Sequence, residues 1–486
     1  MEKYIIWGVG NQGKDLYELF KEAVIIEAFI DNNPDLINTT YNNIRIISFK
    51  DYLNLEDKLP IIISQKYTSD IVQLLEDNNI DNYILASDLL YNLYDTKKFV
   101  CASNYFVDKE YKIMFEWIIN AYKKLLKDYF CFKYLNIKSK QWTDFKNMDF
   151  HNIKCPIINE SSESINKAYE IILRNKLNFA RLESLPEKAD FLVVHGMKIN
   201  FILEHLVMEA EMRNIPIVFS EDGFIRSIVP YKLKSDMKYK LSHAAIFDDK
   251  GVYIYANGIS NIEAGLNSDF QLSNEQRIRA SKVMRSIIDN KISKYNHQPF
   301  MELKVGNPER KKVLVIDQVY GDMSIEWGWA DDQSFDDMLK AAINENPNAD
   351  ILVKTHPESS VAKGYFTHLE NKGNIYKIDF AINPISLLEQ VDKVYVCTSQ
   401  MGFEALMCGK EVHVFGMPFY AGWGVTHDRM KCPRRIKTRS IEEIFYIAYI
   451  MCTIYVSHKT NSVCEIEQVI DDILELRDEY FNNTMK

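Results

Sequence analysis

The sequence has few of the features that mark exported or membrane-spanning proteins. Its eight cysteines include no Cys-x-x-Cys pair and no regular spacing, which argues against a disulfide framework or a zinc motif. Its first residues, Met-Glu-Lys before an apolar strand, lack the regions of a secretory signal. The longest apolar stretch, Ile444 to Val456, has 13 residues, whereas a membrane-spanning helix needs roughly 20. We therefore expect a cytoplasmic protein and a buried helix over Ile444 to Val456.

Basic residues are fewer than acidic residues. The chain has 58 basic and 68 acidic residues and a net charge of −10, which speaks against an extended nucleic-acid surface. A local basic pocket that binds a small anion is still compatible with this charge balance. The 486 residues, 47% of them hydrophobic, allow two to four domains with packed cores and exclude a disordered or fibrous chain.

Short apolar strands alternate with amphipathic helical stretches in three successive segments. The pattern predicts an α/β protein with three Rossmann-like units, in residues 1–95, 96–305 and 306–486, the second of which begins with a helical connector. The expected strands lie at 4–7, 24–30, 60–64, 83–86, 191–194, 215–219, 312–317, 350–354, 393–397 and 411–415.

The connector contains a basic amphipathic stretch. Its apolar residues fall at spacings of three and four, with lysines on the other faces: Met114, Ile118, Tyr122, Leu125 and Tyr129. Such a helix either packs on the next domain or lies on an anionic membrane surface.

A glycine motif follows the first strand. Gly8-x-Gly10-x-x-Gly13, with Asp31 at the end of the next strand, fits the fingerprint of dinucleotide-binding domains. One hypothesis is therefore an NAD-linked oxidoreductase or a nucleotide-binding scaffold. The other is a structural or partner-docking domain, because no catalytic Tyr-x-x-x-Lys can be tied to the motif.

Two polar corners follow apolar strands in the third segment. The first is Lys354-Thr355-His356-Pro357, in which the proline suits the first turn of a helix. The second runs from Thr398 to Glu404 and offers two hydroxyls and helix N-terminal amides to an anion. Open α/β sheets bind ligands at the carboxyl ends of strands, so both corners suit one nucleotide phosphate. Either corner alone is also explained as an ordinary capped helix start.

An aromatic and glycine-rich loop and a basic stretch come next. The loop, residues 416–424, contains Tyr420, Gly422 and Trp423, and it either stacks on a base or sugar or forms a rigid turn. The basic stretch from Arg429 to Arg439 is either a solvated face or an attraction site for a phosphate or anionic acceptor.

Adjacent carboxylates mark a strand end in the second segment. Glu221-Asp222-Gly223 suits acid/base or nucleophilic work on a sugar carbon, because neighbouring like charges shift each other's pKa. An ordinary Asp-Gly turn is the alternative. Gln318 occupies a similar strand-end position in the third segment.

Together these stretches resemble the capsule polysaccharide biosynthesis family of bacterial glycosyltransferases, which includes the retaining β-Kdo transferases. The resemblance covers about residues 190 to 465 and rests on residues 220–227, 317–325, 353–358, 398–410 and 415–426. It implies a GT-B pair of Rossmann-like lobes behind a small N-terminal accessory domain. Residues 96–305 would then hold the acceptor-side lobe, and residues 306–486 the donor-side lobe.

The resemblance also implies roles for individual residues. Asp222 would be the catalytic carboxylate, as a base in an inverting enzyme or as a nucleophile in a retaining one, with Glu221 and Arg226 handling the acceptor proton and the donor carboxylate. The donor would be CMP-Kdo or another CMP-sugar. Its expected binding residues are Lys354, His356, Pro357, Thr398, Ser399, Gln400, Glu404, Gln318, Tyr420, Gly422 and Trp423.

No cofactor or metal is expected, because such folds neutralise the leaving phosphate with basic and helix-terminal groups and the chain has no Asp-x-Asp motif. The expected partners are a lipid-linked glycan acceptor, the inner face of the cytoplasmic membrane and capsule assembly proteins. The sequence departs from the family after Ser227, where it reads Ile228 to Lys232 near the expected acceptor site.

Overall fold

A computed structural model describes most of the chain outside the connector. The described residues are 2–21, 24–63, 71, 74–75, 77–85, 143–150, 152–158, 162–179, 185–196, 210, 213–355 and 364–484. They form two compact units, of which the first contains one sheet and the second contains two. The amphipathic stretch 114–129 lies outside the described residues, so its two interpretations stay predictions.

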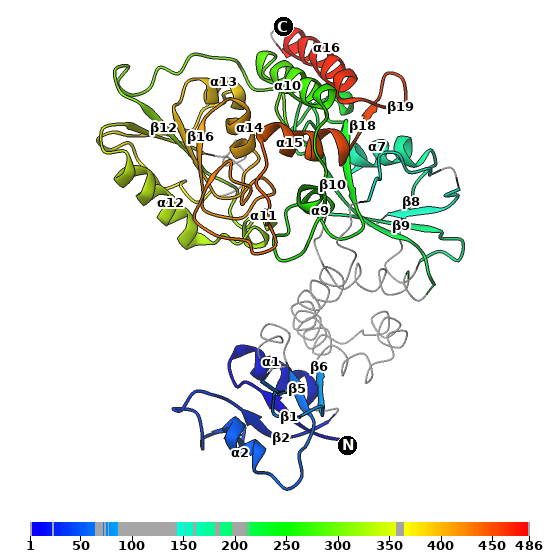
Figure 1. The fold of residues 1–486 in the computed structure, drawn as a ribbon, viewed down its shortest axis with the longest axis vertical. Coiled ribbons are helices and arrows are strands. Elements are labelled where there is room, and N and C mark those ends of the chain that lie inside the picture. The colour runs from blue at the N-terminus through cyan, green and yellow to red at the C-terminus, as the bar shows by residue number, and fades with distance from the viewer. Residues whose placement is uncertain are drawn as a thin grey trace. The chain divides into compact units, whose positions relative to one another are not determined.

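The first unit contains the N-terminal sheet, in the order β3-β4-β2-β1-β5-β6 (Figure 1). All its neighbours are parallel except the β3–β4 hairpin. Isoleucines fill its core because both faces are covered. Its elements are β1 (Lys3–Trp7), α1 (Asn11–Phe20), β2 (Ile25–Ile30), β3 (Thr40–Tyr41), β4 (Ile44–Ile47), α2 (Phe49–Leu53), β5 (Ile61–Ile63) and β6 (Tyr83–Leu85).

The second unit contains the middle sheet, in the order β19-β18-β11-β10-β9-β7-β8. Its strands from β10 to β8 are parallel, and β11, β18 and β19 join antiparallel. The strands are β7 (Pro156–Ile158), β8 (Asn178–Phe179), β9 (Phe191–His195), β10 (Ile217–Asp222), β11 (Ala244–Asp248), β18 (Thr453–Ser457) and β19 (Ser462–Cys464). The end of the chain thus returns to the middle sheet, whereas the sequence analysis assigned all of 306–486 to one lobe.

The same unit contains the C-terminal sheet, in the order β14-β13-β12-β15-β16-β17. Every pair is parallel, and in chain order this arrangement is 3-2-1-4-5-6, the Rossmann order. The strand order reverses between β12 and β15, where such sheets bind ligands. The strands are β12 (Lys312–Ile316), β13 (Asp350–Lys354), β14 (Ile375–Ile378), β15 (Lys393–Val396), β16 (Glu411–Val414) and β17 (His427–Asp428).

Helices cover both sheets of the second unit, and several begin with a side-chain cap. Ser273 and Asp331 form capping boxes at the starts of α10 and α12. In Figure 1, α16 lies beside α10 although the two are far apart in the sequence. The helices are α7 (Glu163–Leu173), η2 (Met237–Tyr239), α9 (Asn261–Asn267), α10 (Asn274–Asp289), α11 (Met323–Trp327), α12 (Asp332–Glu345), α13 (Pro384–Glu389), α14 (Met401–Met407), α15 (Ile441–Phe445), η4 (Tyr446–Met451) and α16 (Ile466–Thr484).

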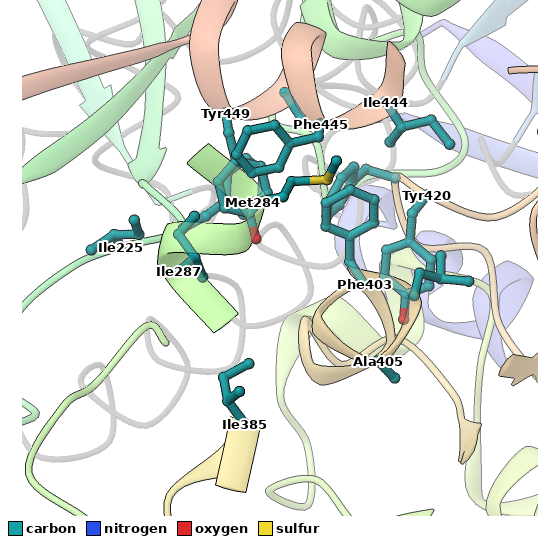
Figure 2. Close-up of a cluster of buried hydrophobic side chains, with 14 of the residues drawn as sticks. Ile225, Met284, Ile287, Ile385, Phe403, Ala405, Tyr420, Ile444, Phe445 and Tyr449 are labelled. Carbon is teal, nitrogen blue, oxygen red and sulfur yellow. The ribbon is translucent and has the colours of Figure 1, made fainter. Parts of the chain in front are cut away.

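One apolar core joins the two sheets of the second unit. Figure 2 shows Phe403 and Tyr420 packed near Phe445 and Tyr449, with Met284 of α10 beside them. Phe224, which follows β10, stacks on Tyr449 with ring centroids 4.3 Å apart. The segment after β10 is therefore fixed against α14 and η4 by apolar packing.

The helix predicted over Ile444 to Val456 is correct only for its first part. The helical turns end at Met451, and Thr453 to Ser457 form β18. Residues 453–457 are rich in β-branched and aromatic residues and pair with β11, which explains why they form a strand and not a helix. Among the described residues, no helix is both long and apolar enough to cross a bilayer.

Candidate active site

Asp222 is the last residue of β10, at the carboxyl end of the parallel part of the middle sheet. The next residue must be glycine, because a Cβ on Gly223 would lie 2.3 Å from the Cβ of Ala244. This close contact brings the backbone of residues 222 and 223 against β11. The Asp-Gly pair therefore continues the strand beside β11 and is not an ordinary turn, and its carboxylate is held at a strand end where chemistry is expected.

The Asp222 carboxylate lies among basic groups. Its Oδ2 is 2.8 Å from Nε of Arg226, and both side chains are largely buried. Burial alone would raise the pKa of Asp222, but the charges of Arg226, Lys294 and His195 outweigh it and hold this pKa below its ordinary value. Asp222 is therefore ionised at neutral pH. Its Oδ1 is buried and has no hydrogen-bond partner among the described residues.

A chain of hydrogen bonds lies next to this carboxylate. The hydroxyl of Tyr169, on α7, donates to Oγ of Ser220 at 2.8 Å and lies 2.7 Å from Nδ1 of His195 at the end of β9. Burial raises the pKa of Tyr169 well above its ordinary value, so the phenol stays protonated. The ends of β9 and β10 are thereby linked through α7.

Two residues of the Thr398–Glu404 corner connect the C-terminal sheet to this region. Gln400 donates from Nε2 to the carbonyl of Phe224 at 2.8 Å. Glu404 is buried and accepts from Oγ of Ser293 at 2.7 Å. Burial raises the pKa of Glu404 to about 7, despite the hydrogen bonds of Ser293 and Gln400. In the structure Gln400 holds the segment after Asp222 and Glu404 holds the segment that contains Ser293, and the predicted binding of donor by both residues stays a prediction.

The reversal point of the C-terminal sheet is formed by Gln318 and Thr398. Gln318 follows β12 and donates from Nε2 to Oγ1 of Thr398 at 2.9 Å, while its Oε1 accepts from the Thr398 amide. A Cβ on Gly328 or Gly416 would lie within 3 Å of the Thr398 methyl group. Ser399 is half-buried beside it and accepts from the Met401 amide. These polar groups lie where the strand order predicts a ligand.

The first polar corner departs from the prediction at Lys354. This lysine is buried, and its ammonium donates to the carbonyls of Thr355, Ile378 and Phe380 at 2.9–3.3 Å. All three of its protons are used on carbonyls at the carboxyl ends of β13 and β14, so it has none left for a donor sugar. His356 and Pro357 lie outside the described residues, and their donor-binding role stays a prediction.

The aromatic loop is a rigid turn, which was the alternative to ligand stacking. Tyr420 and Trp423 are completely buried. Tyr420 donates to the Ser399 carbonyl at 2.6 Å, and Trp423 donates to the Phe419 carbonyl at 2.9 Å. Gly422 has a φ of +81°, which favours glycine. The rings of Tyr420 and Trp423 are thus packed inside the protein, and donor contact by this loop stays a prediction.

The basic stretch is also structural over most of its length. Arg435 is buried and lies 3.2 Å from Glu263 of α9, and Arg434 lies 2.8 Å from the same carboxylate. Arg439 donates to the carbonyls of Leu266 and Phe270 at the end of α9. These arginines bind α9 to the C-terminal part of the chain, so they do not form an open surface for an anion.

The glycine motif of the first unit forms the expected tight turn. Gly8 has a φ of +90°, and a Cβ on Gly13 would lie 1.8 Å from the Gly8 carbonyl oxygen. Gly10 is the residue that precedes α1. Asp31 accepts from the Val9 and Asn33 amides at 2.9 Å, so one of its oxygens holds the glycine turn and the other holds the turn after β2. Dinucleotide binding stays a prediction.

Sequence reasoning missed Lys294, Tyr253 and Ser293. Lys294 is half-buried, and the negative groups around it, Asp222 among them, outweigh burial and raise its pKa above the ordinary range. Neither Lys294 nor Tyr253 follows a predicted strand, so the strand-end rule could not select them. Contacts between distant segments bring this connector to the site, among them the hydrogen bonds from the Arg226 and Ser227 amides to the Lys294 carbonyl and from Ser293 to Glu404.

Residues 303–460 match the family model described as capsule polysaccharide biosynthesis protein, and residues 1–85 match a model described as C2185-like, N-terminal. The chain is 39% identical over 275 residues to the capsule polysaccharide modification protein LipA of Neisseria meningitidis serogroup B, covering 54% of this chain and 38% of that protein. It is 36% identical over 265 residues to the lipopolysaccharide-processing protein LpsZ of Rhizobium meliloti, covering 53% of this chain and 58% of that protein. It thus spans about two fifths and three fifths of these curated relatives.

A solved structure covers more of the chain. The β-Kdo 2,4 transferase of Thermosulfurimonas dismutans KpsC is 35% identical, with a TM-score of 0.59, over 67% of this chain and all of that one. The α/β architecture predicted from the sequence is confirmed by the three sheets and by this similarity. Since the compared transferase chain is matched along its whole length, this protein belongs to the capsule polysaccharide biosynthesis family.

Proposed function

We propose that this protein is a glycosyltransferase of capsule or surface-polysaccharide synthesis. It transfers Kdo or a similar acidic sugar from a CMP-activated donor to a lipid-linked glycan. The observation that carries the proposal is the ionised Asp222 at the end of β10, tied through Gln400 and Phe224 to the corner beside the Rossmann reversal point. A nucleotide at that reversal point would bring its sugar toward the middle sheet, where Asp222 lies.

The donor side of the proposal rests on Thr398 and Ser399. Their hydroxyls lie at the reversal point of the C-terminal sheet, and Gln318 fixes the orientation of Thr398. Hydroxyl and amide donors of this kind bind phosphate oxygens well. Because Arg226 is already paired with Asp222, we assign the donor's carboxylate to Lys294 instead. Arg226 then positions Asp222.

The proposed reaction retains configuration in two steps. An Asp222 oxygen forms a bond to the anomeric carbon, and the bond from that carbon to the phosphate oxygen breaks, releasing CMP. The acceptor hydroxyl then attacks the same carbon, Glu221 takes its proton, and the ester to Asp222 breaks. Oδ1 lacks a hydrogen bond and is the attacking atom, so donor binding must displace the side chains that cover it.

A basic and apolar loop beside the site supports the lipid-linked acceptor. Tyr231 and Leu233 are about 40% exposed and alternate with the exposed Lys232 and Lys234. The loop begins just after Ile228 and Val229, whose amides both bond to the Tyr239 carbonyl. Exposed apolar and cationic side chains in alternation bind anionic lipid surfaces. Contact with the inner membrane is part of the same proposal.

The central experiment is transfer from CMP-Kdo to a lipid-linked acceptor, together with intact-protein mass spectrometry. The wild type should turn over and gain the mass of one Kdo residue before acceptor is added. Asp222→Asn should lose both signals while CMP binding, measured by calorimetry, is kept. Asp337→Asn, on the exposed part of α12, is the matched control and should behave as wild type.

Three outcomes would contradict parts of this proposal. Full turnover by Asp222→Asn removes Asp222 from the mechanism. Turnover with an inverted product and no adduct removes retention. Binding of NAD without binding of CMP removes the transferase and favours the glycine motif of the first unit.

The lipid contact is tested separately by co-sedimentation with vesicles. Wild type should bind vesicles that contain phosphatidylglycerol and should release them at high salt. Leu233→Ser should weaken this binding, whereas Val463→Ser, at an exposed residue on β19, should not. Equal binding by wild type and Leu233→Ser would exclude the loop.

A further inference from the structure

Three metal-ligating side chains meet at the edge of the C-terminal sheet. Glu411 and His413 lie on β16, and His427 lies on β17. His413 and His427 are paired directly in the β16–β17 register. Residues two apart on a strand share a face, so the pairing places all three side chains together. None of them contributes to the Asp222 site.

The ligand atoms of this cluster have separations close to those of a tetrahedral zinc site. Oε1 of Glu411 is 2.8 Å from Nε2 of His413 and 3.7 Å from Nε2 of His427. All three atoms lie within 4.8 Å of one another. Zinc bonds of about 2.0–2.1 Å in tetrahedral geometry place ligand atoms about 3.3 Å apart. The ligand atoms are thus close enough for one ion, although the stacked rings of His413 and His427 must first rotate apart so that both lone pairs point at it.

A supporting shell surrounds His413. Its ring stacks on Tyr395, with centroids 4.5 Å apart, and on His427 at 4.6 Å. Oε2 of Glu345 is 3.6 Å from the Nδ1 of His413 and accepts from the Tyr395 hydroxyl. Metal-binding histidines commonly donate their second ring N–H to a carboxylate, which fixes the ring and raises its basicity. Glu345 takes this role when the Arg429 guanidinium, which lies 3.4 Å from the same Nδ1, turns away from it.

One cation competes for the same oxygen. Nζ of Lys393 is 2.9 Å from Oε1 of Glu411. The side chains of Glu411 and His427 are 43% and 63% exposed, so water has access to complete the coordination. A metal ion would thus displace a surface ion pair, which contributes little net stability.

We propose that Glu411, His413 and His427 form a binding site for a divalent transition ion, with Zn²⁺ as the best match to two imidazoles and one carboxylate. The ion fastens the two-residue strand β17 to β16. Asp428 of β17 accepts from the Gly422 amide, so the ion also anchors the end of the aromatic loop. It takes no part in sugar transfer.

The test is titration of the full-length protein with ZnCl₂ in competition with a chromogenic chelator. One equivalent should bind, and His427→Ala and Glu411→Gln should each weaken binding by about tenfold or more. Lys393→Met should tighten it, because the competing cation is gone. His368→Ala, at an exposed histidine outside the cluster, should leave it unchanged.

CoCl₂ provides a second readout, since a site with two imidazoles and one carboxylate gives visible ligand-field bands without thiolate charge-transfer bands. The exposed position of His427 makes its variant a mild one for folding, which circular dichroism checks. Absence of zinc binding at a molar excess overturns the proposal. So does binding that persists in both ligand variants or that shows thiolate bands, which would assign the ion to cysteines.

Discussion

Glu404→Gln should change the pH dependence of stability. Glu404 is 2% exposed, bonds to Ser293 and Gln400, and lies in the core between the middle and C-terminal sheets. Burial raises its pKa from 4.5 to about 7. The folded protein therefore holds a proton on Glu404 that the unfolded chain has lost between these two values. The contribution of the protonated carboxyl is fully present below pH 4.5 and is lost as the pH rises through 7.

The size of the effect follows from linkage between protonation and folding. Stability falls with pH where the folded state binds more protons, by up to about 1.4 kcal/mol per pH unit. A pKa difference of roughly 2.5 units then removes about 2.5 kcal/mol between pH 5 and pH 8. Glutamine accepts the same hydrogen bonds and has no proton to lose. Between pH 5 and pH 8, the free energy of unfolding of Glu404→Gln relative to the wild type should therefore rise by this amount.

Calorimetric Tm values of both proteins at pH 5 and pH 8 measure the difference. For a unit of some 300 residues the gain corresponds to roughly 3–4 °C. Glu309→Gln removes an exposed carboxylate and reports the effect of the charge change alone. If the offset between Glu404→Gln and wild type is the same at both pH values, Glu404 is ionised in the folded state and the burial argument is refuted.

Four substitutions test other contacts of the second unit. Arg435→Met removes a buried partner and should lower the free energy of unfolding by about 3 kcal/mol, whereas Arg429→Gln at an exposed ion pair should cost under about 1 kcal/mol; urea unfolding compares them. Gly223→Ala brings a Cβ to 2.3 Å from Ala244 and should abolish transfer and lower the Tm in calorimetry. Lys294→Met should raise the KM for CMP-Kdo about tenfold or more with the Tm unchanged.

The strands could be predicted from the sequence because their signal is local. All ten expected strands are present within three residues of their predicted bounds, and Asp222 and Thr398 lie at strand ends as expected. An apolar run bounded by turn residues is enough to find a buried parallel strand. Other strands were missed, among them β7, β11, β14 and β18; the last was interpreted as part of a helix, and only pairing between distant segments identifies it as a strand.

The donor-binding residues were harder to predict because their role depends on what fills their hydrogen bonds. Lys354 and Tyr420 follow strands in the same manner as Thr398, yet the structure uses their polar groups on its own carbonyls. A sequence shows which polar groups exist, but it does not show which of them form hydrogen bonds within the folded protein and are then unavailable to a ligand. Lys294 is the opposite case: it lies at the site, yet it belongs to a connector and follows no predicted strand.

The distribution of positive charge follows the same logic. Arg434, Arg435 and Arg439 are neighbours in the sequence, but their partners on α9 lie about 170 residues away. The charges of this basic run are therefore paired with, or hydrogen-bonded to, groups of α9. Arg226 and Lys294 stand apart in the sequence and converge on one carboxylate. We therefore expect the anionic donor to bind Lys294, which is isolated in the sequence, and not the arginines of the basic run. If Lys294 meets the donor's carboxylate, removing it should cost donor affinity, and removing Arg435 should cost stability instead.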